Sequence, residues 1–350
     1  MIAFGMNIHR RGFLQLGAGA ATAWMAKGQR KSRPVSIDVH THWTPQPYRK
    51  AIAELGHASE LDANPLNFDL DKRVKWMDEH GVQMHVLTLS GRMPWQWVAP
   101  ETGAALARML NDAAVEAHAA FPDRFLGGVE VSIRDPKLAL DELNRVAGKP
   151  GLRALHLPNS IERKDYLFGP AYEPLLARCE ELGLPLLFHP LDGDVNYYAP
   201  SRMGDDLSSR ANLMNTLGFL FETATTAAKF IVTGTLDKFP RLEVILPHSG
   251  GVFPYLAGRV EHGLKRKQFT LRRPFKEYIR RFHYDTLAYY PETLRFLIDT
   301  VGSDRVVIGT DNYAVMDVEY PNALVEQLKL PSADRERILR GNARRLLRLA

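Results

Sequence analysis

Residues 35–45 read VSIDVHTHWTP, an apolar β-like run that ends with two histidines one residue apart. Side chains at positions i and i+2 of a strand point to the same face, so His40 and His42 are expected to project together from the strand's end. Two neutral imidazoles side by side suit a transition metal. A polar turn with two exposed, inactive histidines is the alternative.

Similar runs return along the chain, where apolar, β-branched segments alternate with amphipathic segments of helical periodicity. The predicted strands are 35–40, 82–89, 125–132, 152–157, 184–189, 242–248, 282–286 and 305–311. The predicted helices are 69–81, 101–121, 136–148, 171–183 and 291–302. Strand-and-helix units repeated in this way predict an α/β fold, a (β/α)₈ TIM barrel. A doubly wound open sheet is the alternative, but its Gly-rich phosphate turn after the first strand is missing here.

Polar residues stand where these strands end. His40 and His42 close the first strand, His189 the fifth, His248 the sixth and Asp311 the eighth. The carboxyl ends of barrel strands open on one face, which is where barrel enzymes hold their chemistry. Residues far apart in the sequence are therefore expected to meet in one cavity.

Three imidazoles and one carboxylate can hold a divalent metal and leave room for water, as in a catalytic site. We expect His40, His42, His189 and Asp311 to hold one ion. Zinc is the first choice because the ligands are rich in nitrogen, and manganese, iron or cobalt remain open. His248 is expected to act as an acid or base beside the metal-bound water, with a role as fifth ligand as the alternative. Asp311 can ligate and also accept a proton.

The composition favours one large domain, residues 34–350, since 350 residues with 45% hydrophobic content can bury a sizeable core. The formal charge of +5 is modest. Basic residues cluster at 259–281, but without an aromatic stacking pattern, so we expect no nucleic-acid partner. Cys179 is the single cysteine and cannot form an intramolecular disulfide. We expect it to pack as a small hydrophobe.

The N-terminus resembles a twin-arginine export signal. Arg10 and Arg11 precede Gly12, Phe13 and Leu14, and a Gly/Ala-rich run too short for a membrane span follows. Residues 1–33 are thus predicted to be an export signal and linker, which implies a periplasmic or secreted protein with no stable membrane insertion. The alternative is an uncleaved N-terminal extension on a cytoplasmic protein.

The motifs at the strand ends carry a family resemblance. HTH at 40–42, FHP at 188–190, PHSGG at 247–251 and GTD at 309–311 resemble the amidohydrolase superfamily in its amidohydrolase-related branch. More narrowly, HSGGVFP at 248–254 and GRVEHG at 258–263 resemble aminocarboxymuconate semialdehyde decarboxylase and its relatives. The resemblance runs from about Val35 to the C-terminus and implies a metal-dependent TIM barrel of the hydrolase type.

This resemblance assigns the roles of metal ligand to His40, His42, His189 and Asp311 and of catalytic histidine to His248. It also implies that Arg259 reaches a substrate carboxylate across a homodimer interface, which suits the planar guanidinium. An exposed or structural arginine is the alternative. The superfamily's bridging lysine after strand four has no match at 152–160, which favours one metal ion. His156 in that strand is expected to be a hydrogen-bonded core histidine.

Trp43, Trp95 and Trp97 follow strands one and two and can wall an aromatic or conjugated substrate, or simply pack the loops. We assign Trp43 to substrate binding.

The primary functional hypothesis is a metal-dependent decarboxylase that acts on a small unsaturated or aromatic carboxylate. The alternative in the same fold is a hydrolase of an amide, ester or lactone that uses the same site. A metal-bearing binding protein without turnover is the alternative from another class.

Overall fold

The computed structural model describes residues 35–162, 164–192 and 211–349, which belong to one compact unit. The predicted export signal and linker, residues 1–33, lie outside these residues, so that prediction stays open. No helix within the described ranges combines the length and apolar character that crossing a bilayer requires.

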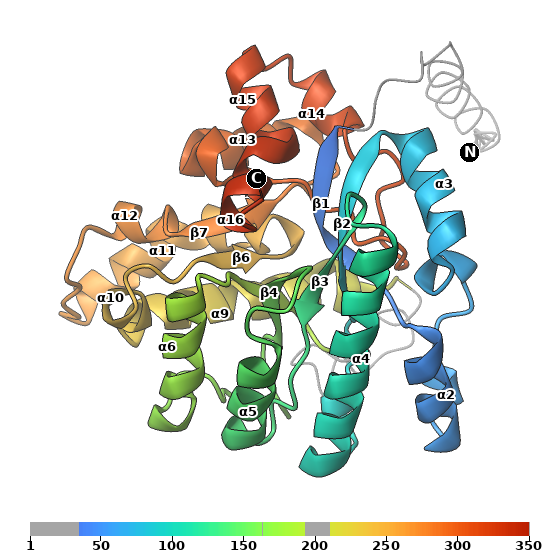
Figure 1. Ribbon diagram of the computed structural model, residues 1–350. Coiled ribbons are helices and arrows are strands. Elements are labelled where there is room, and N and C mark those ends of the chain that lie inside the picture. Colours follow the sequence, from blue (N-terminus) through green and yellow to red (C-terminus); the bar gives the residue numbers. More distant parts are fainter. Residues whose placement is uncertain (1–34, 163, 193–210, 350) are drawn as a thin grey trace, which may run out of the picture. The chain divides into compact units, whose positions relative to one another are not determined.

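Eight parallel strands form the centre of the described unit, with helices around them (Figure 1). The strands are β1 (Ser36–His42), β2 (Val82–Thr88), β3 (Phe125–Val129), β4 (Leu152–Pro158), β5 (Leu186–His189), β6 (Val244–Leu246), β7 (Phe282–Asp285) and β8 (Val306–Val307). Each strand pairs in parallel with the next along the chain. Parallel bridges from Asp38 to Ile308 and from Thr41 to Asn312 join the last strand region to β1. The predicted (β/α)₈ barrel is therefore confirmed.

Helices lie between the strands and also follow β8, and five of them fall on the predicted amphipathic segments. They are α2 (Gln46–Glu54), α3 (Leu70–His80), α4 (Pro100–Ala120), α5 (Pro136–Val146), α6 (Glu173–Leu182), α9 (Phe219–Val232), α10 (Thr235–Lys238), α11 (Phe253–Arg266), α12 (Phe275–Ile279), α13 (Pro291–Val301), α14 (Ala323–Gln327), α15 (Ser332–Glu336) and α16 (Asn342–Leu346). Asp69 caps α3 by accepting a hydrogen bond from the Lys72 N–H, and Gly81 ends the helix at a φ of 73°. Left-handed backbone of this kind favours glycine, which explains the helix stop.

An extra residue in β1 prepares the face on which the predicted ligands lie. Asp38 pairs with His85 and Thr41 with Leu87, so three steps along β1 match two along β2. Such a bulge re-aims the side chains that follow it. Ile37 and Val39 belong to the apolar cluster that fills the barrel. His40 lies within the bulge and His42 follows it, at the carboxyl end of the strand.

The apolar interior is closed at the opposite end by the C-terminal helix. Ala343, Leu346 and Leu347 are buried in the same cluster as Ile37 and Val39. The end of the barrel at the amino ends of the strands is thus filled by packed side chains. The other end, at the carboxyl ends of the strands, is open and can hold an active site.

Candidate metal centre and active-site cavity

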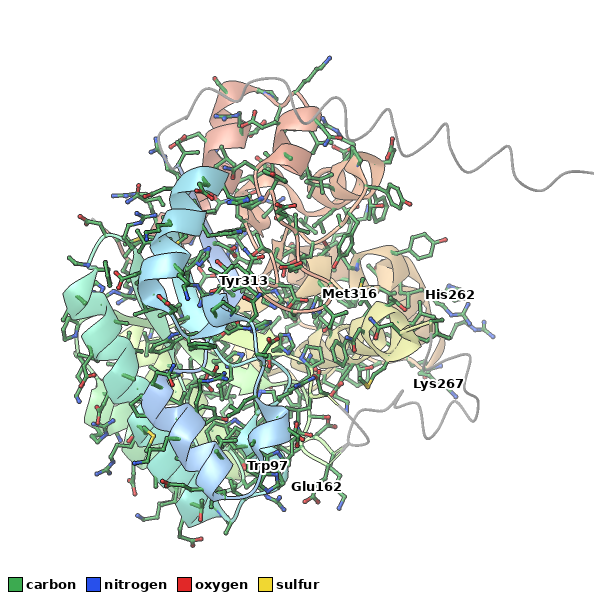
Figure 2. The ribbon with its side chains drawn as sticks, turned by 90° about the vertical axis from the view of Figure 1, so that its right-hand side faces the viewer. Trp97, Glu162, His262, Lys267, Tyr313 and Met316 are labelled. Carbon is green, nitrogen blue, oxygen red and sulfur yellow. The ribbon has the colours of Figure 1, made fainter. Side chains whose placement is uncertain are left out.

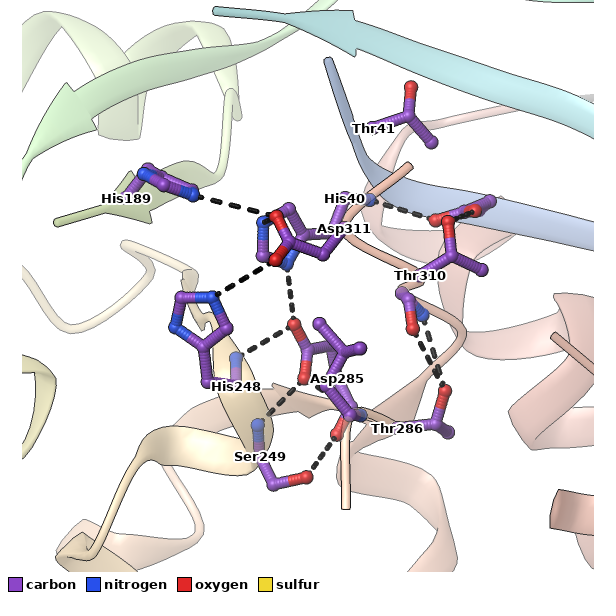
Figure 3. A network of polar contacts seen from close by, with 12 residues as sticks. His40, Thr41, His189, His248, Ser249, Asp285, Thr286, Thr310 and Asp311 are labelled. Atoms are coloured by element: carbon purple, nitrogen blue, oxygen red, sulfur yellow. Dashed lines mark hydrogen bonds and ion pairs between the residues drawn. The ribbon is translucent and has the colours of Figure 1, made fainter. Parts of the chain in front are cut away.

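The four predicted ligands meet at the carboxyl ends of the strands. Their ligand atoms lie within 4.8 Å of one another, and all four residues are buried. Nε2 of His42 is 2.7 Å from Oδ1 of Asp311, and Nε2 of His40 is 3.4 Å from the same oxygen. His189 presents its Nε2 at 3.7 Å from Oδ1 of Asp311 (Figure 3). Residues from opposite ends of the sequence therefore form one compact cluster.

Each histidine ring is oriented through its other nitrogen. Nδ1 of His40 donates to Asp285 at 2.7 Å, Nδ1 of His42 to the Leu89 carbonyl at 3.1 Å, and Nδ1 of His189 to the Pro190 carbonyl at 2.7 Å. Such outer hydrogen bonds select the ring tautomer and are typical of metal-ligating histidines. All three Nε2 atoms are consequently directed at one place.

The charges in this cluster fit a bound cation. Burial lowers the pKa of His42 to about 3, so its ring is neutral and has one N–H, which Nδ1 donates in the hydrogen bond to the Leu89 carbonyl. Its Nε2 lone pair then faces a carboxylate oxygen, and two acceptors in contact repel unless a cation lies between them. Nε2 of His40 is buried without a hydrogen-bond partner in the described part of the chain. The four residues therefore fit a divalent metal ion.

Asp311 and His40 carry the strongest charge interactions. Burial raises the pKa of Asp311, but the surrounding side chains of His189, His40 and His42 outweigh it and hold the pKa well below its usual range. Burial opposes the charged form of His40, yet the hydrogen bond to Asp285 and the nearby Asp311 carboxylate raise its pKa to about 10. In the absence of an ion, His40 thus holds a proton where a cation would otherwise sit.

Asp285 is a site residue that sequence analysis missed. One oxygen accepts from His40 Nδ1 and from the His248 N–H at 2.9 Å, and the other accepts from the Ser249 N–H at 2.7 Å. Asp285 therefore holds a metal-ligand ring and the turn that carries His248 (Figure 3). Gly309 makes room for it, since a Cβ there would lie 2.6 Å from the Asp285 Cβ. The available signal was an acidic residue at the end of the seventh strand.

His248 lies beside the ligand cluster. It follows β6 after Pro247, in a short turn where His248 and Ser249 have φ values of 54° and 56°. Its Nε2 is 3.9 Å from Oδ2 of Asp311. Burial lowers the pKa of His248 to about 4, so the ring is neutral and able to accept a proton. Its position suits the predicted role of acid or base, which stays a prediction.

The predicted strands that carry His248 and Asp311 end earlier than expected. Strands 242–248 and 305–311 are shortened to β6 (Val244–Leu246) and β8 (Val306–Val307), because the chain leaves the sheet before His248 and Asp311. Asp311 itself has a φ of 60°. Backbone in this left-handed region cannot continue a strand, and it turns both side chains toward the cluster.

A cavity of about 450 Å³ opens onto the cluster. Its wall includes aromatic side chains from loops and from the helices α2 and α9: Trp43, Tyr48, Phe219, Tyr289 and Tyr313. Trp43 thus lies where a substrate-binding residue was predicted. Trp95 is buried in the core and Trp97 stacks on His57 at 3.7 Å, and neither is among the described wall residues. The wall suits a flat, largely apolar molecule.

Two arginines differ in their relation to this cavity. Arg259 lies on an exposed part of α11 and is not among the described residues of the wall. His262 of the same helix is also on the outside (Figure 2). Arg92, which sequence analysis did not single out, lines the cavity with its Nε 3.5 Å from Oδ2 of Asp192. Nothing in its sequence context distinguishes it from a surface arginine.

The family model described as Amidohydrolase matches residues 37–349. The chain belongs to the amidohydrolase family. Among curated proteins, this amidohydrolase is 27% identical over 344 residues to 2-amino-3-carboxymuconate-6-semialdehyde decarboxylase of Dictyostelium discoideum, covering 91% of this chain and 92% of that one. It is 30% identical over 297 residues to gamma-resorcylate decarboxylase of Rhizobium sp. (strain MTP-10005), covering 80% and 87%.

Solved structures agree with this assignment. The 5-carboxyvanillate decarboxylase of Sphingomonas paucimobilis superposes with a TM-score of 0.76 at 27% identity and covers 91% of this amidohydrolase and 100% of that chain. The dihydroxybenzoic acid decarboxylase of Polaromonas sp. JS666, solved with manganese and 2-nitroresorcinol, has a TM-score of 0.75 at 25% identity and covers 90% and 97%. The chain is therefore an enzyme of the amidohydrolase family with a divalent-metal site.

Proposed function

We propose that this amidohydrolase is a metal-dependent decarboxylase that acts on a small aromatic or unsaturated carboxylate. The observation that carries the proposal is the juxtaposition of a buried His₃Asp cluster with a cavity walled by aromatic side chains. The reaction class is inferred from the decarboxylases named above, because this protein is similar to them over most of its length.

The protein's own groups account for substrate orientation and proton handling. His40, His42, His189 and Asp311 would hold the divalent ion, which would polarise an oxygen of the acid and lower the pKa of a bound water. Trp43 and Phe219 contact the faces or edges of a planar substrate from the cavity wall. When CO₂ leaves, the carbon that carried it must take up one proton. His248 is neutral, so it must first take up a proton from water or from the substrate before it donates one to that carbon. The Asp311 carboxylate, whose Oδ2 is 3.9 Å from His248 Nε2, is ionised and has no proton to supply.

Arg259 and homodimerisation belong together in this proposal. In one chain Arg259 is exposed on α11, so it can serve a cavity only of a second subunit. Tyr255 of the same helix is 79% exposed and contacts the exposed Phe296 of α13. Exposed aromatic pairs of this kind are typical of subunit contacts. Arg92, on the wall of the same chain, is a second candidate to hold an anionic substituent.

One set of experiments tests homodimerisation and the roles of Arg259 and Arg92 in substrate binding. Light scattering on the purified protein is expected to give a dimer. Arg259→Leu is expected to raise KM for a carboxylate substrate at least tenfold while the dimer persists, and Arg92→Leu reports the contribution of the same-chain arginine. A monomer with full activity would remove Arg259 from the site.

The metal and the location remain further parts of the proposal. Nitrogen-rich ligation favours Zn²⁺, whereas the Polaromonas relative was solved with Mn²⁺. Reconstitution of metal-free protein with each ion decides which supports turnover. We also propose export through the N-terminal signal at residues 1–33. Fractionation of cells that express the wild-type and an Arg10→Lys/Arg11→Lys variant tests it, with periplasmic protein expected only for the wild type.

Hydrolysis of an amide, ester or lactone at the same site is the competing reaction. The decisive assay follows CO₂ release from a panel of hydroxybenzoic and muconate-type acids beside hydrolysis of esters, lactones and amides, together with metal analysis. One ion per chain with CO₂ release supports the proposal. Hydrolysis without CO₂ overturns it in favour of the hydrolase, and metal binding without either reaction would leave a binding protein.

A further inference from the structure

A buried acid–imidazole pair lies next to the metal centre and has no part in the proposed reaction. Glu130 follows β3, and His156 lies in β4 as the sequence predicted, outside the ligand cluster. Oε1 of Glu130 accepts a hydrogen bond from Nδ1 of His156 at 2.8 Å. The two side chains are only 3% and 1% exposed. Burying a carboxylate is unfavourable unless it is well paired, so this placement needs a reason.

The same carboxylate oxygen also contacts the backbone that orients a metal ligand. Oε1 of Glu130 accepts from the Leu89 N–H at 3.0 Å. The carbonyl of Leu89 is the acceptor for Nδ1 of His42, at 3.1 Å. A continuous line of hydrogen bonds therefore runs from His156 through Glu130 and residue 89 to the His42 ring.

Glu130 is itself held in place from behind. Asn111 of α4 accepts from the Glu130 N–H and donates to the Glu130 carbonyl, both at 2.8 Å. Asn111 also donates to Oε1 of Glu142 at 2.7 Å. Asn111 holds the backbone of Glu130 and His156 holds its carboxylate. Glu130 therefore provides a fixed acceptor for the Leu89 N–H.

Stability alone does not account for the carboxylate. Oε2 of Glu130 is buried without a hydrogen-bond partner among the described residues. Replacing such incompletely paired buried ionic groups with apolar side chains is often neutral or stabilising. A role that depends on where Oε1 holds the Leu89 N–H explains the pair better than a contribution to the core.

We propose that Glu130 is a positioning residue of the metal centre: held by His156, it fixes the backbone of Leu89 so that the His42 ring keeps its Nδ1 proton on the Leu89 carbonyl and directs Nε2 at the ion. The inference rests on the metal centre proposed above and is independent of the reaction that the centre performs. Outer contacts of this kind commonly change metal affinity 10- to 100-fold.

The test is the affinity of the full chain for Mn²⁺, measured by calorimetric titration of metal-free protein. Glu130→Leu removes the acceptor and is expected to weaken Mn²⁺ binding about 10- to 100-fold. Glu130→Gln retains an amide oxygen for the Leu89 N–H and is expected to restore affinity to within about threefold of wild type. Glu142→Leu is the matched control, because Glu142 is a buried carboxylate that contacts the same Asn111 but, among the described residues, makes no hydrogen bond to residue 89.

The absorption spectrum of the Co²⁺ protein and the variant His156→Phe distinguish a positioning role of Glu130 from a loss of the folded structure. The visible absorption of the Co²⁺-substituted protein is expected to change in Glu130→Leu and to return in Glu130→Gln, whereas a purely structural effect lowers the unfolding temperature of all metal-free variants alike. If Glu130→Leu does not fold, His156→Phe, which frees the carboxylate, is expected to weaken Mn²⁺ binding about 10-fold, at the low end of such effects.

The outcomes are distinguishable. A wild-type protein that binds no Mn²⁺, Zn²⁺ or Co²⁺ overturns the proposed metal centre itself. A wild-type protein that binds the ion, with a folded Glu130→Leu or His156→Phe variant of equal affinity, overturns only the role of Glu130. Equal weakening in Glu142→Leu overturns it as well, since the effect then belongs to the network's stability.

Discussion

At the scale of single residues, the centre depends on which nitrogen of each histidine carries a proton. Nδ1 donates outward in His40, His42 and His189, and this leaves Nε2 for the ion. His248 differs, because its Nε2 is 3.9 Å from Asp311 and its Nδ1 is buried without a partner in the described part of the protein. Ligand and acid–base roles therefore separate by geometry among residues of one type.

His248→Ala is expected to lower kcat by about 100-fold or more, since a positioned acid or base contributes that much, and to leave one ion per chain. Steady-state kinetics and metal analysis of the same sample provide the measurement. Asp311→Asn, which changes a ligand, is expected to lose both turnover and tight metal binding. Loss of the metal from His248→Ala would instead make His248 a ligand.

Metal binding is expected to depend on pH through His40. Its pKa of about 10 in the metal-free protein means that, at neutral pH, an ion must displace one proton. Affinity should therefore rise about tenfold per pH unit, or about 100-fold between pH 6 and pH 8, and level off near pH 10. The stabilisation that the proton gives the metal-free fold is full below the ordinary histidine pKa and is lost as pH rises toward 10.

Calorimetric titrations in buffers of different ionisation enthalpy measure this directly. They are expected to report one proton released per ion near pH 7. A dissociation constant for Mn²⁺ that stays constant from pH 6 to pH 8 would contradict a proton on His40.

At the scale of elements, α3 does more than its amphipathic pattern indicates. Met77 packs in the core, and Arg73 on the same helix is also completely buried. Its Nη2 donates to the His42 carbonyl at 2.8 Å and its Nε to Nδ1 of His85 at 3.0 Å. Burial lowers the pKa of His85, which keeps its ring neutral and able to accept. A helix on the outside of the barrel thus holds the end of β1.

Arg73→Met is expected to lower the free energy of unfolding of the metal-free protein by about 3 kcal/mol, since two buried acceptors lose a charged donor. Urea unfolding measures the change. Lys75→Met is the matched control on the exposed face of the same helix and is expected to change it by less than about 0.5 kcal/mol. A similar small change for both variants would mean that water replaces Arg73.

At the scale of the whole described unit, the barrel has one open end and one closed end. The closed end is packed by α16, whose Leu346 is 3% exposed. The open end carries the ligand cluster and the aromatic cavity, because every strand in a parallel barrel presents its carboxyl end there. The packing contacts of α16 and the candidate active site therefore lie at opposite ends of the same strands.

Leu346→Ala is expected to lower the free energy of unfolding by about 2–4 kcal/mol through the cavity that it leaves, without changing metal affinity. Leu55→Ala, at a side chain that is 44% exposed, is expected to have little effect. Urea unfolding measures the change in the free energy of unfolding, and Mn²⁺ titration measures metal affinity. Weakened metal binding in Leu346→Ala would show that the two ends are coupled.

The amino-acid sequence by itself determined the barrel, the order of its strands and the four candidate ligands. Local patterns suffice for these features, because apolar alternation and strand-end position are properties of short segments. Only the tertiary structure decided that Asp285 orients His40, that Glu130 and Arg73 hold the surroundings of His42, and that Arg92 rather than Arg259 lines the cavity of its own chain. These roles arise from contacts between residues on different strands and helices, and local sequence carries no record of which buried acceptor meets which donor.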